Sequence, residues 1–116
     1  MRKSAILLSI CIPTFKRGKV LQNTLKSIYS QLDSSNIDKV EVIVTDNDPL
    51  FEDEIYTSPY KKHPNFKYYK NNSKGFTNSL EVLKKGKGTL LKLHNSQMIF
   101  KKQSIDNILR IIESNE

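Results

Sequence analysis

The amino-acid sequence predicts an α/β fold with an open, mainly parallel sheet and flanking helices. Short continuous apolar runs, typical of strands buried on both faces, alternate with segments whose apolar residues recur every three or four positions. Strand and helix segments follow one another in turn along the whole chain, which is characteristic of an α/β sheet. A chain of 116 residues suits one domain, so we expect residues 1–116 to form a single unit.

The first apolar run, Leu7 to Ile12, predicts the first buried strand. Pro13 has no N–H group to donate to a neighbouring strand, so we expect the strand to end there. Cys11 lies within this run, and a small core residue is a better interpretation than a nucleophile. The following helix is indicated by four apolar residues at helical spacing: Leu21, Leu25, Ile28 and Leu32.

The middle of the chain predicts a second strand, a short helix and a third strand. Val40 to Val44 forms the second strand, which the preceding helix joins to the first by a right-handed parallel crossover. The acids of residues 52–54 favour a short helix, because negative charge stabilises its first turn, and Pro59 and Pro64 limit its length. Phe66 to Tyr69 predicts a short third strand.

The last third of the chain repeats the alternation. Phe76, Leu80 and Leu83 recur at helical spacing. Leu90 to Leu93 predicts a fourth strand, which we expect to be buried like the first two. Ser104 can cap a final helix, whose apolar face is formed by Ile105, Ile108, Leu109 and Ile112.

The charge balance is basic, with 19 Lys and Arg against 12 Asp and Glu and a formal net charge of +7. Such an excess favours an anionic partner, which includes nucleotides, nucleic acids and lipid surfaces. The aromatic residues do not alternate with cations as nucleic-acid stacking platforms do, so we expect no nucleic-acid partner. A single cysteine excludes an internal disulfide, and no apolar run approaches the length of a membrane span. We therefore expect a cytoplasmic location.

Polar side chains follow the first two strands where each one ends. After the first strand come a hydroxyl, an aromatic ring and two cations, Thr14, Phe15, Lys16 and Arg17, and Asp46 directly follows the second strand. Open α/β sheets bind ligands at the carboxyl ends of their strands. These groups suit a nucleotide, with polar atoms for the base edge, a ring for stacking and cations for phosphate. An ordinary strand-to-helix turn, with Asp46 as a turn or cap residue, accounts for them as well.

Several other kinds of site are excluded. The first strand-to-helix turn lacks the glycine spacing of dinucleotide-binding folds. Gly86-Lys87-Gly88-Thr89 follows a helix and precedes a strand, the reverse of a phosphate-binding loop. One cysteine and two histidines cannot make a zinc cluster.

Four segments resemble the opening segments of family 2 glycosyltransferases with the GT-A fold: LLSICIPTFKRGKVLQNTLKSIYSQL, KVEVIVTDNDP, NNSKGFTN and GTLLKLHNSQMIFKKQSIDNIL. The likeness runs from Ala5 to Glu113 and is closest to bacterial enzymes that build surface polysaccharides, including abequosyltransferase-like members. It implies a Rossmann-like, GT-A half-domain. The implied activity is hexosyl transfer from a nucleotide sugar to a polysaccharide or lipid-linked acceptor, in the cytoplasm and at the inner face of the membrane.

The resemblance also implies roles for particular residues. Pro13, Thr14 and Phe15 would line the base pocket, Asp46 would contact the base, and Gly75 would lie near the ribose and diphosphate. With the cation Arg17 added, the expected nucleotide-binding residues are Pro13, Thr14, Phe15, Arg17, Asp46 and Gly75. A UDP-sugar or dTDP-sugar is the expected donor, and Mg²⁺ or Mn²⁺ is the family's usual cofactor.

Two departures from the family alter this expectation. Where the family has an acidic metal motif, this chain has His94, Asn95 and Ser96, and no acid occurs between Glu81 and Asp106. Family members also continue past the last helix with the acceptor site and the catalytic base. We therefore expect a donor-binding portion, incomplete at its C-terminal side, with no catalytic residue and no activity alone. The alternative is a non-catalytic module that binds a nucleotide or a protein. A sheet cut short would leave an unpaired edge, which favours a homodimer.

Overall fold

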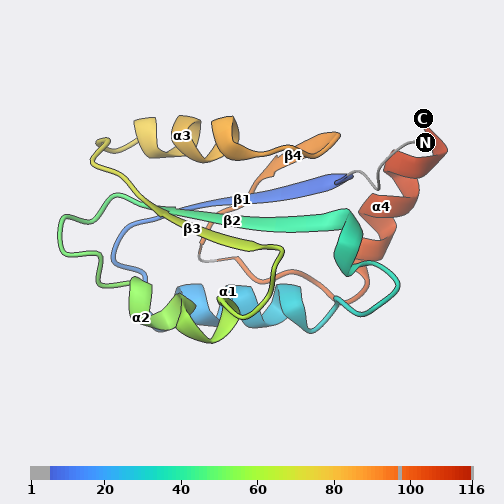
Figure 1. Ribbon diagram of the computed structural model, residues 1–116, viewed down its shortest axis with the longest axis horizontal. Coiled ribbons are helices and arrows are strands. Elements are labelled where there is room, and N and C mark those ends of the chain that lie inside the picture. The colour runs from blue at the N-terminus through green and yellow to red at the C-terminus, as the bar shows by residue number, and fades with distance from the viewer. Residues whose placement is uncertain (1–5, 97, 116) are drawn as a thin grey trace.

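The computed structural model describes residues 6–96 and 98–115, which form a parallel sheet with helices on both faces (Figure 1). The four strands lie in the order β3-β2-β1-β4 and all run parallel. Their bounds are β1 (Leu8–Thr14), β2 (Val40–Asp46), β3 (Phe66–Lys70) and β4 (Leu90–Leu93). The predicted α/β class and the parallel sheet are confirmed.

The helices divide between the two faces of the sheet. α1 (Lys19–Tyr29) and the short α2 (Glu54–Thr57) lie on one face, and α3 (Thr77–Lys85) lies on the other (Figure 1). α4 (Ser104–Ser114) stands at the end of the sheet where the strands begin. Two single turns of 3₁₀ helix, η1 (Ile37–Lys39) and η2 (Ser58–Tyr60), precede β2 and follow α2. No helix among the described residues is long and apolar enough to cross a bilayer.

Side chains along β1 and β2 point alternately to the two faces of the sheet, which divides the core into two clusters. Alternate residues of both strands pack with α1 and α4 in the larger cluster, which includes Ile10, Val42 and Leu25. The residues between them face α3, where Cys11 and Ile43 pack with Val82. Burial raises the pKa of the Cys11 thiol to about 11, which suits the predicted core role of this residue.

β1 does not end at Pro13 as expected but continues through Thr14. The amide of His94 donates to the carbonyl of Cys11, so the backbone polar groups of odd-numbered residues in β1 face β4. β4 pairs only with residues 8–11 of β1. The nitrogen of Pro13 therefore lies beyond the end of β4. The missing N–H group of proline costs β1 no hydrogen bond there.

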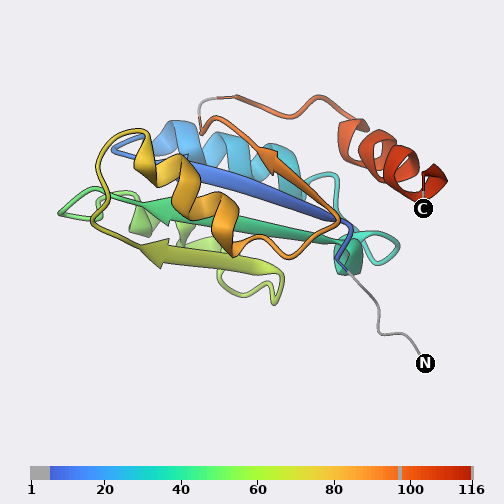
Figure 2. The ribbon, with the colours of Figure 1, turned by 90° about the horizontal axis from the view of Figure 1, so that it is seen from above.

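The expectation that the fourth strand is buried is wrong. Leu90, Leu91 and Leu93 are 43%, 39% and 46% exposed. Figure 2 shows the reason, since β4 forms one edge of the sheet and, among the described residues, pairs with β1 alone. An apolar run indicates a strand, but it does not tell a central strand from an edge strand.

The spacing of Phe76, Leu80 and Leu83 identifies α3 but not its buried face. Phe76 and Leu80 are exposed, and the buried residues of α3 are Asn78 and Val82. These two are four positions apart and so lie on one side of the helix, against the sheet.

Candidate functional site

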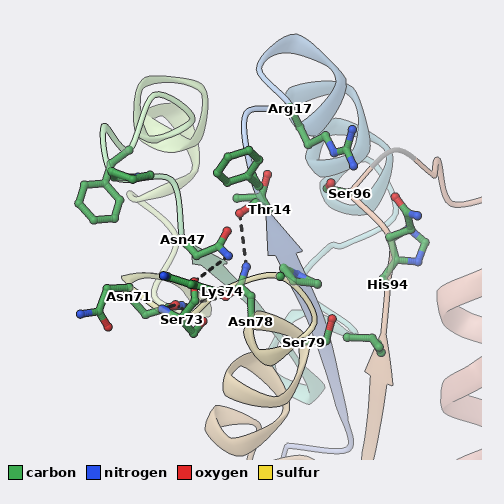
Figure 3. Close-up of a pocket in the computed structure, with 18 residues that line it drawn as sticks. Thr14, Arg17, Asn47, Asn71, Ser73, Lys74, Asn78, Ser79, His94 and Ser96 are labelled. Atoms are coloured by element: carbon green, nitrogen blue, oxygen red, sulfur yellow. Dashed lines mark hydrogen bonds between the residues drawn. The ribbon is translucent and has the colours of Figure 1, made fainter.

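A pocket of about 830 Å³ lies at the carboxyl ends of the strands, within the size range of small-molecule sites. The loops after all four strands contribute to its walls (Figure 3). The lining residues are Pro13, Thr14, Phe15, Arg17, Asn47, Pro49, Phe51, Asn71, Asn72, Ser73, Lys74, Gly75, Asn78, Ser79, Leu93, His94, Asn95 and Ser96.

Most of the predicted nucleotide-binding residues meet at this pocket: Pro13, Thr14, Phe15, Arg17 and Gly75 line it. The ring of Phe15 is 48% exposed and is therefore accessible to a ligand. Gly75 adopts φ +52°, in the left-handed region that favours glycine, so the loop before α3 depends on this residue type.

Asp46 is the predicted site residue that does not line the pocket. Its side chain is fully buried and accepts the hydroxyl of Tyr68 at 2.6 Å and the amide of Asp48 at 3.0 Å. Burial raises the pKa of this carboxyl above its ordinary value, while the two hydrogen bonds oppose that rise. Its carboxylate is engaged with β3 and the loop after β2. Its contact with a base stays a prediction.

Asp53 organises the wall formed by the loop after β1, a role that the sequence did not indicate. Its carboxylate accepts the hydroxyl of Thr14 at 2.6 Å and the amides of Arg17 and Gly18 at 2.9 and 2.7 Å. Lys16 and Gly18 have φ of 52° and 55°, so these bonds hold a loop with left-handed backbone. Since the Thr14 hydroxyl donates its proton to Asp53, its lone pairs can accept a ligand N–H.

Asn78 of α3 links the ends of β1 and β2 by hydrogen bonds, a role that the sequence did not indicate. Its amide group donates to the carbonyl of Thr45 at 3.1 Å and to that of Thr14 at 3.4 Å, while its oxygen accepts from Asn71 at 2.8 Å. A polar residue four positions before the buried Val82 is the signal that could have identified it. Figure 3 shows the hydrogen bond from the Asn78 amide to the carbonyl of Thr14. It also shows a second bond from a side-chain amide to a carbonyl, which Asn47 donates to Ser73 at 2.9 Å.

His94 stands where the resemblance expects the metal motif to begin, and both of its ring nitrogens are engaged. Nε2 lies 2.7 Å from the carbonyl oxygen of Met98, so it must carry the proton, because a carbonyl can only accept. Burial lowers the pKa of this histidine, against the effect of the Met98 bond. The ring is therefore neutral, and the lone pair of Nδ1 accepts from the ammonium of Lys92 at 3.3 Å.

The chemistry of the pocket is cationic. The described residues that line it include Arg17 and Lys74 but no aspartate or glutamate. Within residues 6–96 and 98–115, no group of three His, Cys, Asp or Glu side chains could hold a metal ion. Mg²⁺ and Mn²⁺ favour carboxylate oxygens, so the residues present at this pocket do not fit such an ion.

Comparison with known proteins gives matches to a sequence family and to solved structures. The model of the family described as Glycosyl transferase family 2 matches residues 9–116. No curated protein sequence matches the chain.

The solved structures support the same fold. Residues 1–349 of S. aureus TarS superpose with a TM-score of 0.82 at 18% identity, covering 94% of this chain and 33% of that one. The same protein in complex with UDP-GlcNAc gives 0.79 at 18% identity, covering 94% and 32%. The mannosyltransferase PcManGT from Pyrobaculum calidifontis in complex with GDP-Man and Mn²⁺ gives 0.75 at 16% identity, covering 89% and 31%. The chain thus spans about a third of the length of these proteins.

Proposed function

Because the chain belongs to glycosyl transferase family 2, we propose that its pocket binds the nucleotide part of a sugar donor for glycosyl transfer. The observation that carries the proposal is the meeting of Thr14, Phe15 and Arg17 at one pocket at the carboxyl ends of β1 and β2. Each supplies a different contact that a nucleotide requires. The family as a whole performs glycosyl transfer, and the donor, acceptor and location given below are parts of the proposal.

The base lies against the ring of Phe15, and the Thr14 hydroxyl accepts one of its N–H groups. A uracil or thymine base presents one imide N–H, which suits a wall of acceptors, so the proposed donor is a UDP-sugar or dTDP-sugar. Asp46 is the second proposed base contact, as an alternative acceptor for the same imide N–H. Each of its carboxylate oxygens already accepts one hydrogen bond and keeps a further lone pair. Gly75 and its loop lie beside the ribose and diphosphate.

The solved relatives support a nucleoside diphosphate sugar as the ligand class. TarS is described in complex with UDP-GlcNAc and with UDP, and the mannosyltransferase PcManGT with GDP-Man and Mn²⁺. We propose a polysaccharide or lipid-linked acceptor and a cytoplasmic location at the inner face of the membrane. The net charge of +7 is compatible with an anionic lipid surface.

The chain alone is proposed to bind the donor without transferring the sugar. In an inverting transfer, a carboxylate removes the proton from the acceptor hydroxyl, which attacks the anomeric carbon as the nucleoside diphosphate leaves. No carboxylate lines the pocket among the described residues, so the observed walls supply binding groups but not this base. A chain that binds nucleotides without turnover would also fit the alternative role of a non-catalytic binding module.

Titration calorimetry with UDP, dTDP, GDP and ADP tests the proposal. UDP or dTDP is expected to bind more tightly than ADP, and Phe15→Ala should weaken binding about 5- to 150-fold, the range expected for loss of one base-aromatic stack. Phe76→Ala is the matched control, because Phe76 is 77% exposed and lies outside the pocket. Absence of binding by every nucleotide, or an equal loss in both variants, would contradict the proposal. UDP-sugar hydrolysis by the wild-type chain would contradict the proposed inactivity.

A further inference from the structure

The diphosphate of a donor brings concentrated negative charge into the pocket, and the protein must offset it. Family 2 glycosyltransferases commonly do so with a divalent metal ion held by acidic residues. The residues at this pocket differ from that arrangement in three respects: where the carboxylates point, what His94 is bonded to, and where the cations lie.

The three nearby carboxylates do not line the pocket and accept hydrogen bonds from other parts of the protein. Asp46, Asp48 and Asp53 are 0%, 0% and 1% exposed. Asp48 accepts the amides of Leu50 and Glu52, both at 3.1 Å. Asp53 accepts a hydroxyl and two amides at 2.6–2.9 Å. Moving any of these carboxylates toward a metal ion would leave buried donors without acceptors.

The loop after β4 offers a metal ion only neutral groups. The proton on Nε2 of His94 is donated to Met98, and the lone pair on Nδ1 faces Lys92. Neither nitrogen can bind a metal ion without breaking one of these contacts. The backbone oxygen of Ser96 accepts the hydroxyl of Thr24 at 2.8 Å, which fixes this loop against α1. The side chains of Asn95 and Ser96 carry no charge at neutral pH.

Two cations line the pocket. Arg17 comes from the loop after β1, and Lys74 comes from the loop between β3 and α3, so they belong to different walls of the pocket. Figure 3 shows the Arg17 side chain extending from the start of α1 toward the loop that carries Ser96 and His94. A guanidinium can bind two phosphate oxygens at once through its parallel N–H groups.

We propose that Arg17 and Lys74 hold the donor diphosphate directly, so that nucleotide binding to this chain requires no divalent metal ion. This inference rests on the proposed function, because it assigns the diphosphate contacts of the same pocket. The binding energy then comes from protein cations that are in contact with solvent at the pocket. Affinity should accordingly fall as the salt concentration rises.

The test measures the dissociation constants of UDP and uridine in EDTA and again in MnCl₂ at equal ionic strength. UDP is expected to bind at least about 10-fold more tightly than uridine in EDTA, as one charge-assisted contact provides. MnCl₂ should change the UDP affinity by less than about 2-fold. A Mn²⁺-dependent gain of 10-fold or more, or equal binding of UDP and uridine in EDTA, would overturn the inference. If neither ligand binds under either condition, the proposed function itself fails.

Variants assign the effect to particular residues. Arg17→Gln should weaken UDP binding about 10-fold while leaving uridine binding nearly unchanged, and Lys74→Gln should act in the same direction. Arg110→Gln removes the same charge from the exposed face of α4, outside the pocket, and is the matched control. Equal effects of Arg17→Gln and Arg110→Gln would overturn the assignment.

The reciprocal variant is Asn95→Asp, which replaces the side-chain amide of an exposed pocket residue with a carboxylate of nearly the same shape. It should weaken UDP binding in EDTA and make that binding respond to Mn²⁺. If Asn95→Asp binds UDP in EDTA as tightly as the wild type does, the pocket does not hold the diphosphate near this loop, and the inference fails.

Discussion

Asp53 is fully buried, and its contacts determine the shape of one wall of the pocket. It accepts hydrogen bonds from Thr14, Arg17 and Gly18, and in doing so holds Lys16 in left-handed backbone. Asp46 and Asp48 have comparable roles in the loop after β2. Three acids near a candidate site thus act on loop geometry, while the cations Arg17 and Lys74 line the pocket.

The residue-scale prediction concerns Asp53→Ala. Because three donors lose a charged acceptor, the free energy of unfolding should fall by about 2–4 kcal/mol. Urea unfolding followed by circular dichroism measures the change. Glu52→Ala is the control, since Glu52 is exposed and should change stability by less than about 0.5 kcal/mol. Identical midpoints for the two variants would show that the Asp53 contacts do not stabilise the fold.

The link between α3 and β4 packs closely against β1 and β2. The carboxylate of Glu41 accepts the hydroxyl of Ser9 and the amide of Lys87, both at 2.6 Å, and the Gly88 amide donates to Ser9 at 2.7 Å. These contacts fix where β4 begins beside β1. They also explain the glycine at position 88 without any phosphate-binding role, because the chain there approaches the backbone of β1.

The element-scale prediction concerns Gly88→Ala. A Cβ atom at this position would lie 2.7 Å from Ser9 Oγ, 2.8 Å from the Ser9 nitrogen and 3.0 Å from the Leu8 carbonyl carbon. β1 is a central strand that cannot shift freely, so the substitution should destabilise the protein by about 1–3 kcal/mol. Lys87→Ala changes the exposed neighbouring side chain and is expected to be nearly neutral. Thermal unfolding compares the two, and a Gly88→Ala variant as stable as Lys87→Ala would contradict the packing argument.

The whole sheet has an apolar edge at β4. The amides of Leu90 and His94 donate to β1, so the amide of Leu91 between them points outward. In the part of the chain that the structure describes, no strand pairs with this outer edge. An exposed edge with apolar side chains favours pairing with another chain.

The whole-molecule prediction is therefore self-association through β4. Sedimentation velocity over a range of protein concentrations should show a dimer that increases with concentration. Leu91→Lys should reduce it, because a charge on an edge strand opposes pairing. Leu50→Lys is the control, since Leu50 is 71% exposed and lies in the loop after β2. A wild-type chain that stays monomeric at every concentration, or a dimer that persists equally in both variants, would contradict dimerisation through the β4 edge.

The sequence by itself determined the α/β class and the positions of the four strands, and all of its predicted nucleotide-binding residues except Asp46 line the pocket. Apolar spacing indicates the strands and helices along the chain. Because the carboxyl ends of parallel strands share one edge of the sheet, Thr14, Phe15 and Arg17 meet at the site. Only the tertiary structure decided where the carboxylates point. Asp53 acts on Thr14 across 39 positions, and Asp46 is bonded to Tyr68 across 22, so neither partner is visible in local sequence.

The same distinction applies to β4 and to Asn78. Whether an apolar strand is central or at an edge depends on which strands pair beside it. The residues of the run Leu90–Leu93 do not indicate the order of the strands in the sheet. Asn78 lies on a helix, but the carbonyls that it binds belong to β1 and β2. Hydrogen-bond partners far apart in the chain are chosen by the packing of whole elements, whereas secondary structure follows from the local spacing of apolar side chains.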